Sequence, residues 1–104
     1  MTLKFFILKD RQVVPSTLEE WAAFFSSDDR VVAQWQFADA RVSTVFIGLD
    51  PHAPFMPDDS LPLVFETMIF GGPLDSHQER TATWAEAELM HESMCAMVRA
   101  RVLQ

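Results

Sequence analysis

The sequence contains one cysteine, Cys95, in 104 residues, and a single thiol excludes an internal disulfide. No run approaches the ~18 consecutive apolar residues that a transmembrane helix needs, so no membrane span is predicted. The opening segment, MTLKFFILKD, holds an apolar run too short for a secretion signal, and a strand is the better interpretation. Together these absences predict a protein of a reducing compartment, the cytoplasm.

Motifs that bind phosphate, metal or acyl substrates are also missing. Three glycines do not make a glycine-rich phosphate loop, and no G-x-S-x-G nucleophile elbow occurs. The histidines, His52, His77 and His91, lack the Cys or His spacing of a zinc site. Cys95 lies beside two methionines in a helical pattern, where a buried and unreactive thiol is the default. No cofactor or metal is therefore predicted, and an enzyme is the less favoured class.

Positive charge is scarce as well: eight Lys and Arg stand against fifteen Asp and Glu, a net charge of −7 at pH 7. Residues 50–92 hold nine of these acidic side chains and one basic one, Arg80, so this segment alone carries −8. Such a surplus repels nucleic-acid phosphates and anionic membranes, so neither is expected as a direct partner. A protein partner with a basic surface fits better. The simpler alternative is that the charge only keeps the chain in solution.

Four strands are predicted, at residues 3–8, 30–37, 41–49 and 63–70, from runs of branched and aromatic residues. The stretch from Arg41 to Gly72 holds two of them and should form the centre of a sheet, because the first carries bulk on both faces. Short connections between the middle strands indicate antiparallel pairing. Residues 74–82 are polar and predict a loop.

Two helices are predicted, each with a capping box at its start. The first begins at Ser16 or Thr17 and presents an aromatic face to the core. The second runs from Trp84 to Val102 after Thr83 as its cap, with a broad apolar arc and a narrow charged stripe. The order β-α-β-β-β-α predicts one α+β domain over residues 1–104. We expect a mostly antiparallel four-stranded sheet with both helices packed on one face.

The connector at residues 50–62 has four prolines, so pairing within it is not expected. A loop of this length in a small domain is typical of a functional segment. Asp50 and His52 form a two-ligand fragment, which a metal ion could complete with Glu66 or Asp75.

Glu66 is the other candidate for chemistry. It shares a strand face with Val64 and Met68, and desolvation there would raise its carboxyl pKa, as suits a general acid or base. The alternative is that Glu66 reaches solvent or pairs with Arg41 or Arg80.

Three segments of the sequence resemble a family of small proteins from bacteriophage and prophage genomes: VSTVFIGLD, LVFETMIFGGPLD and ERTATWAEAELMHESM. The resemblance covers roughly residues 41–94. It departs from the family pattern at Pro51, which separates Asp50 from His52, and at Ala82, where the family has serine. It implies a phage origin and the host cytoplasm, with no known reaction. It also points to a set of residues: Asp50, His52, Glu66, Thr67, Arg80, Thr83, Trp84 and His91.

Three functional hypotheses follow. The first is a small acidic phage accessory protein that acts by protein binding, one form of which would be inhibition of a host defence system. The second is a small metal-dependent, hydrolase-like enzyme with Glu66 or His52 as catalytic residue beside Asp50. The third is a homo-oligomer, such as a homodimer, that uses an exposed strand edge or the Met face. The predicted binding residues are Asp50, Asp58, Asp59, Asp75, Glu79, Arg80, Trp84 and His91.

Overall fold

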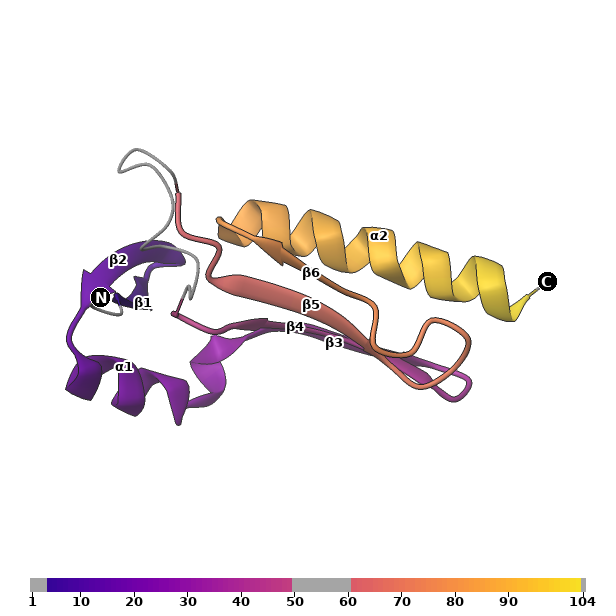
Figure 1. Ribbon diagram of the computed structural model, residues 1–104, viewed down its shortest axis with the longest axis horizontal. Coiled ribbons are helices and arrows are strands. Elements are labelled where there is room, and N and C mark those ends of the chain that lie inside the picture. The colour runs from indigo at the N-terminus through magenta and orange to yellow at the C-terminus, as the bar shows by residue number, and fades with distance from the viewer. Residues whose placement is uncertain (1–3, 50–60, 104) are drawn as a thin grey trace.

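The computed structural model describes residues 4–49 and 61–103, and these ranges hold two helices, one 3-10 turn and six strands (Figure 1). In chain order the elements are β1 (Phe5–Lys9), β2 (Gln12–Ser16), α1 (Leu18–Phe25), η1 (Asp28–Arg30), β3 (Val31–Phe37), β4 (Ala40–Phe46), β5 (Phe65–Phe70), β6 (Gln78–Thr81) and α2 (Trp84–Val102). The predicted starts of both helices are confirmed, because Thr17 caps α1 in a full capping box and Thr83 caps α2.

The strands β3, β4, β5 and β6 form one antiparallel sheet in that spatial order, with β4 and β5 at its centre. α2 lies along one face of this sheet and contacts all four strands (Figure 1). The α+β class, the four-stranded antiparallel sheet and the central strand pair within Arg41–Gly72 are therefore confirmed.

The N-terminal strand does not join this sheet, which is a correction to the predicted order. β1 turns back at Asp10 and Arg11, whose φ angles are 50° and 65°, and pairs with β2 in a separate two-stranded sheet. Positive φ at both central residues is the geometry of a tight hairpin turn. The sequence predicts a charged turn at Lys9, Asp10 and Arg11 and an extended segment over residues 13–15, since Pro15 biases Val14 away from helical geometry, but it does not show that this segment pairs with the first strand. In the hairpin, Pro15 is tolerated opposite Phe6 because β2 is the outer strand among the described residues, whereas β1 also bridges to Leu49.

Two further elements differ from the prediction. Residues 74–82, predicted as a loop, include β6, which forms an edge of the four-stranded sheet. Its sequence, QERT, has no alternation of apolar and polar residues that would indicate a strand. Two of its side chains are exposed and two are half-buried, so the strand needs no apolar face. α1 packs mainly against β1 and η1, whereas α2 covers the face of the sheet (Figure 1). The two helices therefore do not share one face, because the hairpin supplies the surface that buries the aromatic side of α1.

The core lies between α2 and the sheet, and every buried side chain of the described residues belongs to residues 40–98. Phe46 and Phe65 are fully buried and meet edge to face, with ring centroids 5.2 Å apart. From above, α2 contributes Ala87, His91, Met94 and Val98. Apolar burial of this kind is the main stabilising term of a small domain.

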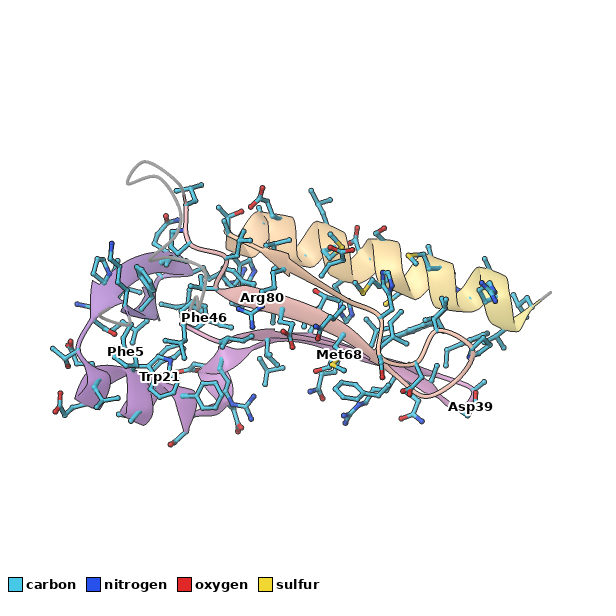
Figure 2. The ribbon with its side chains drawn as sticks, in the orientation of Figure 1. Phe5, Trp21, Asp39, Phe46, Met68 and Arg80 are labelled. Atoms are coloured by element: carbon cyan, nitrogen blue, oxygen red, sulfur yellow. The ribbon has the colours of Figure 1, made fainter. Side chains whose placement is uncertain are left out.

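Residues 4–30 form an N-terminal unit, made of the β1–β2 hairpin, α1 and η1, that has no buried side chain. Within the unit, Trp21 faces Phe5 (Figure 2) with ring centroids 5.4 Å apart. The unit is joined to the rest by aromatic and backbone contacts, and the rings of Phe24 and Phe46 meet edge to face with centroids 5.6 Å apart. The Trp21 indole N–H donates to the Ile47 carbonyl at 2.8 Å. The backbone of β1 completes the joint, since Phe6 N–H donates to the Gly48 carbonyl at 2.9 Å.

Candidate functional site

Four of the predicted site residues, Asp50, His52, Asp58 and Asp59, lie outside the described residues. The metal-dependent hydrolase, which relies on two of them, therefore stays a prediction. The structure places the others at separate points of the fold instead of in one cleft. These points are the Glu66–Arg80 pair, the Thr67–His91 chain, Trp84 at the start of α2, and Asp75 and Glu79 at the β5–β6 end.

Glu66 forms an ion pair with Arg80, which was one of the alternatives for this carboxylate. The two residues are direct cross-strand partners on β5 and β6, with Glu66 Oε2 3.4 Å from Arg80 Nη2. Arg80 Nη1 also donates to two carbonyls, of Leu49 at 3.4 Å and of Leu63 at 3.3 Å. Arg80 thus holds both ends of the connector at 50–62 against the sheet, and Glu66 orients the arginine for this task.

A chain of hydrogen bonds runs between the sheet and α2. The Thr44 hydroxyl lies 2.9 Å from the Thr67 hydroxyl and 2.8 Å from Nδ1 of His91. Both threonines are sealed from solvent, with 0% and 1% exposure, and His91 is 8% exposed. Buried polar groups are tolerated when they are hydrogen-bonded to one another, and such a chain fixes the position of a helix on its sheet.

The Thr67–Thr44–His91 chain has the chemistry of a structural contact. Burial lowers the pKa of His91, although the Glu92 carboxylate beside it acts in the opposite direction. The imidazole is therefore neutral at pH 7 and hydrogen-bonds to Thr44 without a buried charge. A substrate cannot reach the Thr44 hydroxyl, so the hydroxyl–histidine pair is not a nucleophile with its base. Glu66 lies on the other face of the sheet and does not join this chain.

A hollow of about 350 Å³ lies beside His91, between α2 and the edge of the sheet at β3. Cys95 lines this hollow, and burial raises the pKa of its thiol, while Arg99 lowers it and Glu92 raises it. The thiol is therefore protonated at pH 7 and a poor nucleophile, although Cys95 is half-buried and not buried as predicted. Within the described ranges, no three His, Cys, Asp or Glu side chains gather closely enough to hold a metal ion.

Trp84 lies at the start of α2, under the turn of the β1–β2 hairpin. The Arg11 guanidinium carbon sits 4.7 Å from the centre of the Trp84 ring, a cation–π contact. A groove of about 730 Å³ runs beside this pair, between the hairpin and the first turn of α2. The Trp84 indole nitrogen is buried and has no hydrogen-bond partner among the described residues. Trp84 thus fastens the N-terminal unit to α2 from the side opposite Trp21.

The predicted acidic binding residues of the β5–β6 end serve local structure. Asp75 Oδ1 accepts a hydrogen bond from Gly71 N–H at 2.6 Å and closes the turn between the strands. Glu79 Oε1 lies 3.9 Å from His77 Nε2, and both side chains are exposed, so this pair adds little free energy.

The outward face of α2 carries a strip of apolar side chains, which was not predicted as a binding surface. We call it the outer strip; it consists of the exposed residues Ala85, Leu89, Ala96, Ala100 and Leu103. Leu89 is 67% exposed and Leu103 is 70% exposed, the largest values among the large apolar side chains of the described residues. Glu88 and Glu92 lie beside the strip on the flank of α2 that faces β3. The helical pattern placed these alanines next to the charged stripe, and that spacing was the available signal.

Two further residues of these sites, Thr44 and Arg11, were not predicted as functional. Thr44 is 47 residues from His91 in the chain, and Arg11 belongs to a turn that was interpreted as merely charged. Comparison of the chain with protein-family models, with curated proteins and with solved structures finds no match. The functional argument therefore rests on the geometry of the molecule. In the part of the chain that the structure describes, neither helix has the length and apolarity to cross a membrane.

Proposed function

We propose that this chain is a small accessory protein that acts by binding another protein, and that the outer strip of α2 is its binding surface. The carrying observation is that α2 is apolar on two sides, while the sheet covers one. An exposed apolar patch on a folded protein marks a site of interaction with another surface. The sheet takes Ala87, His91, Met94 and Val98, and it leaves the outer strip open.

The charges around the outer strip favour a protein partner with a basic surface. Glu86, Glu88 and Glu92 lie on the first half of α2, and the chain carries −7 overall. An apolar strip with an acidic rim matches a protein surface on which an apolar ridge is flanked by Lys and Arg. The rim speeds encounter with such a surface, and the apolar centre supplies most of the affinity.

The groups that an enzyme hypothesis would use are engaged in the fold. Glu66 is paired with Arg80, the Thr44 hydroxyl is sealed beneath α2, and burial keeps the Cys95 thiol protonated. The resemblance to phage proteins supports a partner in the bacterial host. Inhibition of a host defence system is the form of binding to test first.

A photo-crosslinking residue at position 89 tests the surface, with position 18 as the matched control. Leu18 lies on α1 and is 53% exposed, so it presents a comparable side chain on another face. In bacterial cells we expect one discrete adduct from position 89 and none from position 18. Glu88→Lys with Glu92→Lys should reduce the yield of that adduct about tenfold. Equal adducts from both positions, or none from position 89, would contradict the proposal.

A plaque assay tests the biological form of the proposal. We expect cells that carry an active defence system to admit more phage when they express the chain. Leu89→Lys should remove this effect and Leu18→Lys should keep it, with circular dichroism showing that both variants are folded. Loss of the effect in both variants alike would argue against a surface on α2.

A further inference from the structure

β3 is an open edge of the sheet. Its seven residues, Val31–Phe37, pair with β4 on one side, and no described element pairs with the other side. Edge strands present free backbone N–H and C=O groups, so they are templates for another strand. The β3 edge is therefore a possible point of attachment for a further chain.

The composition of β3 is unusual for an unpartnered edge. Edge strands are normally protected by shortness, charge or proline. The other edge, β6, follows this rule, because it has four residues and two of them, Glu79 and Arg80, are charged. β3 reads VVAQWQF, with no charge and no proline. Its single irregularity is a shift of register between Val31 and Ala33, which leaves the run from Ala33 to Phe37 regular.

We propose that β3 pairs with β3 of a second copy of this chain, antiparallel about a twofold axis, to make a continuous eight-stranded sheet. A twofold axis places the same strand on both sides and reverses its direction, as antiparallel pairing requires. The uncharged strand then meets itself without like charges in contact.

The side chains of β3, on both faces of the sheet, favour a second copy of the chain as the partner. Gln34 and Gln36 are exposed on the open face, where amides from two copies can hydrogen-bond with each other. On the α2 face, the rings of Trp35 and Phe37 are stacked, with centroids 5.3 Å apart and planes 4° from parallel. A second copy would extend this half-buried pair into a larger aromatic cluster.

The flank of α2 beside β3 carries charges that match under the same symmetry. Glu92 and Arg99 line the hollow that also borders Gln34 and Trp35. Arg99 lies over Trp35, with its guanidinium carbon 5.5 Å from the ring centre. A twofold axis near Trp35 reverses the order of the two charges in the second copy. Arg99 of one copy then lies on the same side of the axis as Glu92 of the other copy.

This surface is distinct from the outer strip of α2. In the paired form both α2 helices lie on the same side of the eight-stranded sheet, so the two outer strips point the same way. A dimer would therefore offer two copies of the proposed binding surface, and a partner with two matching sites would be held more tightly by avidity.

Molar mass in solution tests the pairing, by sedimentation equilibrium and light scattering of the full chain. We expect twice the 11.9 kDa of one chain at about 100 µM, a concentration at which micromolar dimers are assembled. Gln36→Glu should raise the dissociation constant at least about tenfold, and adding Gln34→Glu should raise it about a hundredfold or more. Neither change should destabilise the monomer. A glutamate at position 36 would lie opposite Arg41, and the Ser43 hydroxyl can donate to a carboxylate at position 34.

The matched control is Gln78→Glu, the same substitution on the β6 edge. It should leave the dissociation constant unchanged. A chain that stays monomeric at about 1 mM would overturn the proposal, since specific interfaces are assembled far below that concentration. A dimer that is indifferent to both β3 changes, or equally weakened by Gln78→Glu, would overturn it too. A dimer that is lost in Leu89→Lys and kept in Gln36→Glu would place the contact on α2 and also count against β3.

Discussion

The molecule has two regions that are stabilised by different means. Residues 31–103, the sheet with α2, contain every buried side chain of the described chain, whereas the N-terminal unit at 4–30 contains none. The first region is held by apolar burial, which is large and non-directional. The second is held by half-buried apolar side chains that pack against the core, among them Phe6 and Phe24, and by a few directional contacts at Trp21, Gly48 and Arg11. We therefore expect the N-terminal unit to open locally at a lower free energy than the sheet unfolds.

The largest effect should come from the core of the sheet. Ile69→Ala removes a fully buried side chain and leaves a cavity, so the free energy of unfolding should fall by about 2–5 kcal/mol. Urea denaturation measures this loss, and amide exchange should quicken in both regions, because the whole fold is weakened. The control Leu18→Ala changes a residue that is 53% exposed and should cost less than about 0.5 kcal/mol.

The next effect should separate the two regions. Gly48 has a φ of +71°, and an added Cβ would lie 2.5 Å from the Phe6 carbonyl oxygen and 2.8 Å from both Cδ1 of Trp21 and Cε2 of Phe46, the last residue of β4. Gly48→Ala should therefore cost about 1–3 kcal/mol and displace β1 and α1. Hydrogen exchange should quicken at residues 5–25 while β4 and β5 keep their protection. If β4 and β5 lose protection by the same factor, the two regions unfold together and the comparison fails.

A pH dependence should follow from His91 in the second region. Its pKa in the folded chain lies below the ordinary 6.5, so the unfolded chain takes up the proton first as the pH falls. The free energy of unfolding should therefore decrease below about pH 6.5, by at most about 1.4 kcal/mol per pH unit, and this group should contribute no slope above it. His91→Gln should reduce this decrease of the free energy of unfolding at low pH. His77→Gln, on the exposed β5–β6 turn, should leave the decrease as it is. An unchanged decrease in His91→Gln would disprove the assignment to His91.

The smallest effect should come from the hairpin turn. Arg11→Ala removes the contact over Trp84 and should cost about 0.5–1 kcal/mol, with faster exchange in β1 and β2 only. Arg11→Gly removes the same contact but relaxes a φ of 65° and creates Asp-Gly, a favoured turn dipeptide. Its cost should be clearly smaller than that of Arg11→Ala. Equal costs would show that the turn conformation contributes nothing measurable.

Each of the two regions has elements that the sequence predicts and an element that it does not. Capping residues such as Thr17 and Thr83, and alternation in β4 and β5, are local signals, and the elements that depend on them were predicted correctly. The hairpin was missed because Pro15 and a turn without glycine or asparagine hid it. β6 was missed because a short edge strand buries too little to show a pattern.

The candidate sites depend on contacts between distant residues, which local patterns do not contain. The pair of Glu66 with Arg80 was predicted as one of two pairings, since a carboxylate on an apolar strand needs a partner or access to solvent. The link from Thr44 to His91 requires the register of β4 under α2, and the contact of Arg11 with Trp84 requires the placement of the hairpin. Neither follows from spacing along the chain.

Arg80 has a consequence for the connector between β4 and β5. The carbonyls of Leu49 and Leu63 are both held by this one side chain, which lies outside the connector itself. Because its flanking residues are fixed in this way, lengthening the connector raises the entropic cost of closing the loop by only about 0.6 kcal/mol for each doubling of length. The pairing of β4 with β5 therefore places little demand on the number of residues that join them.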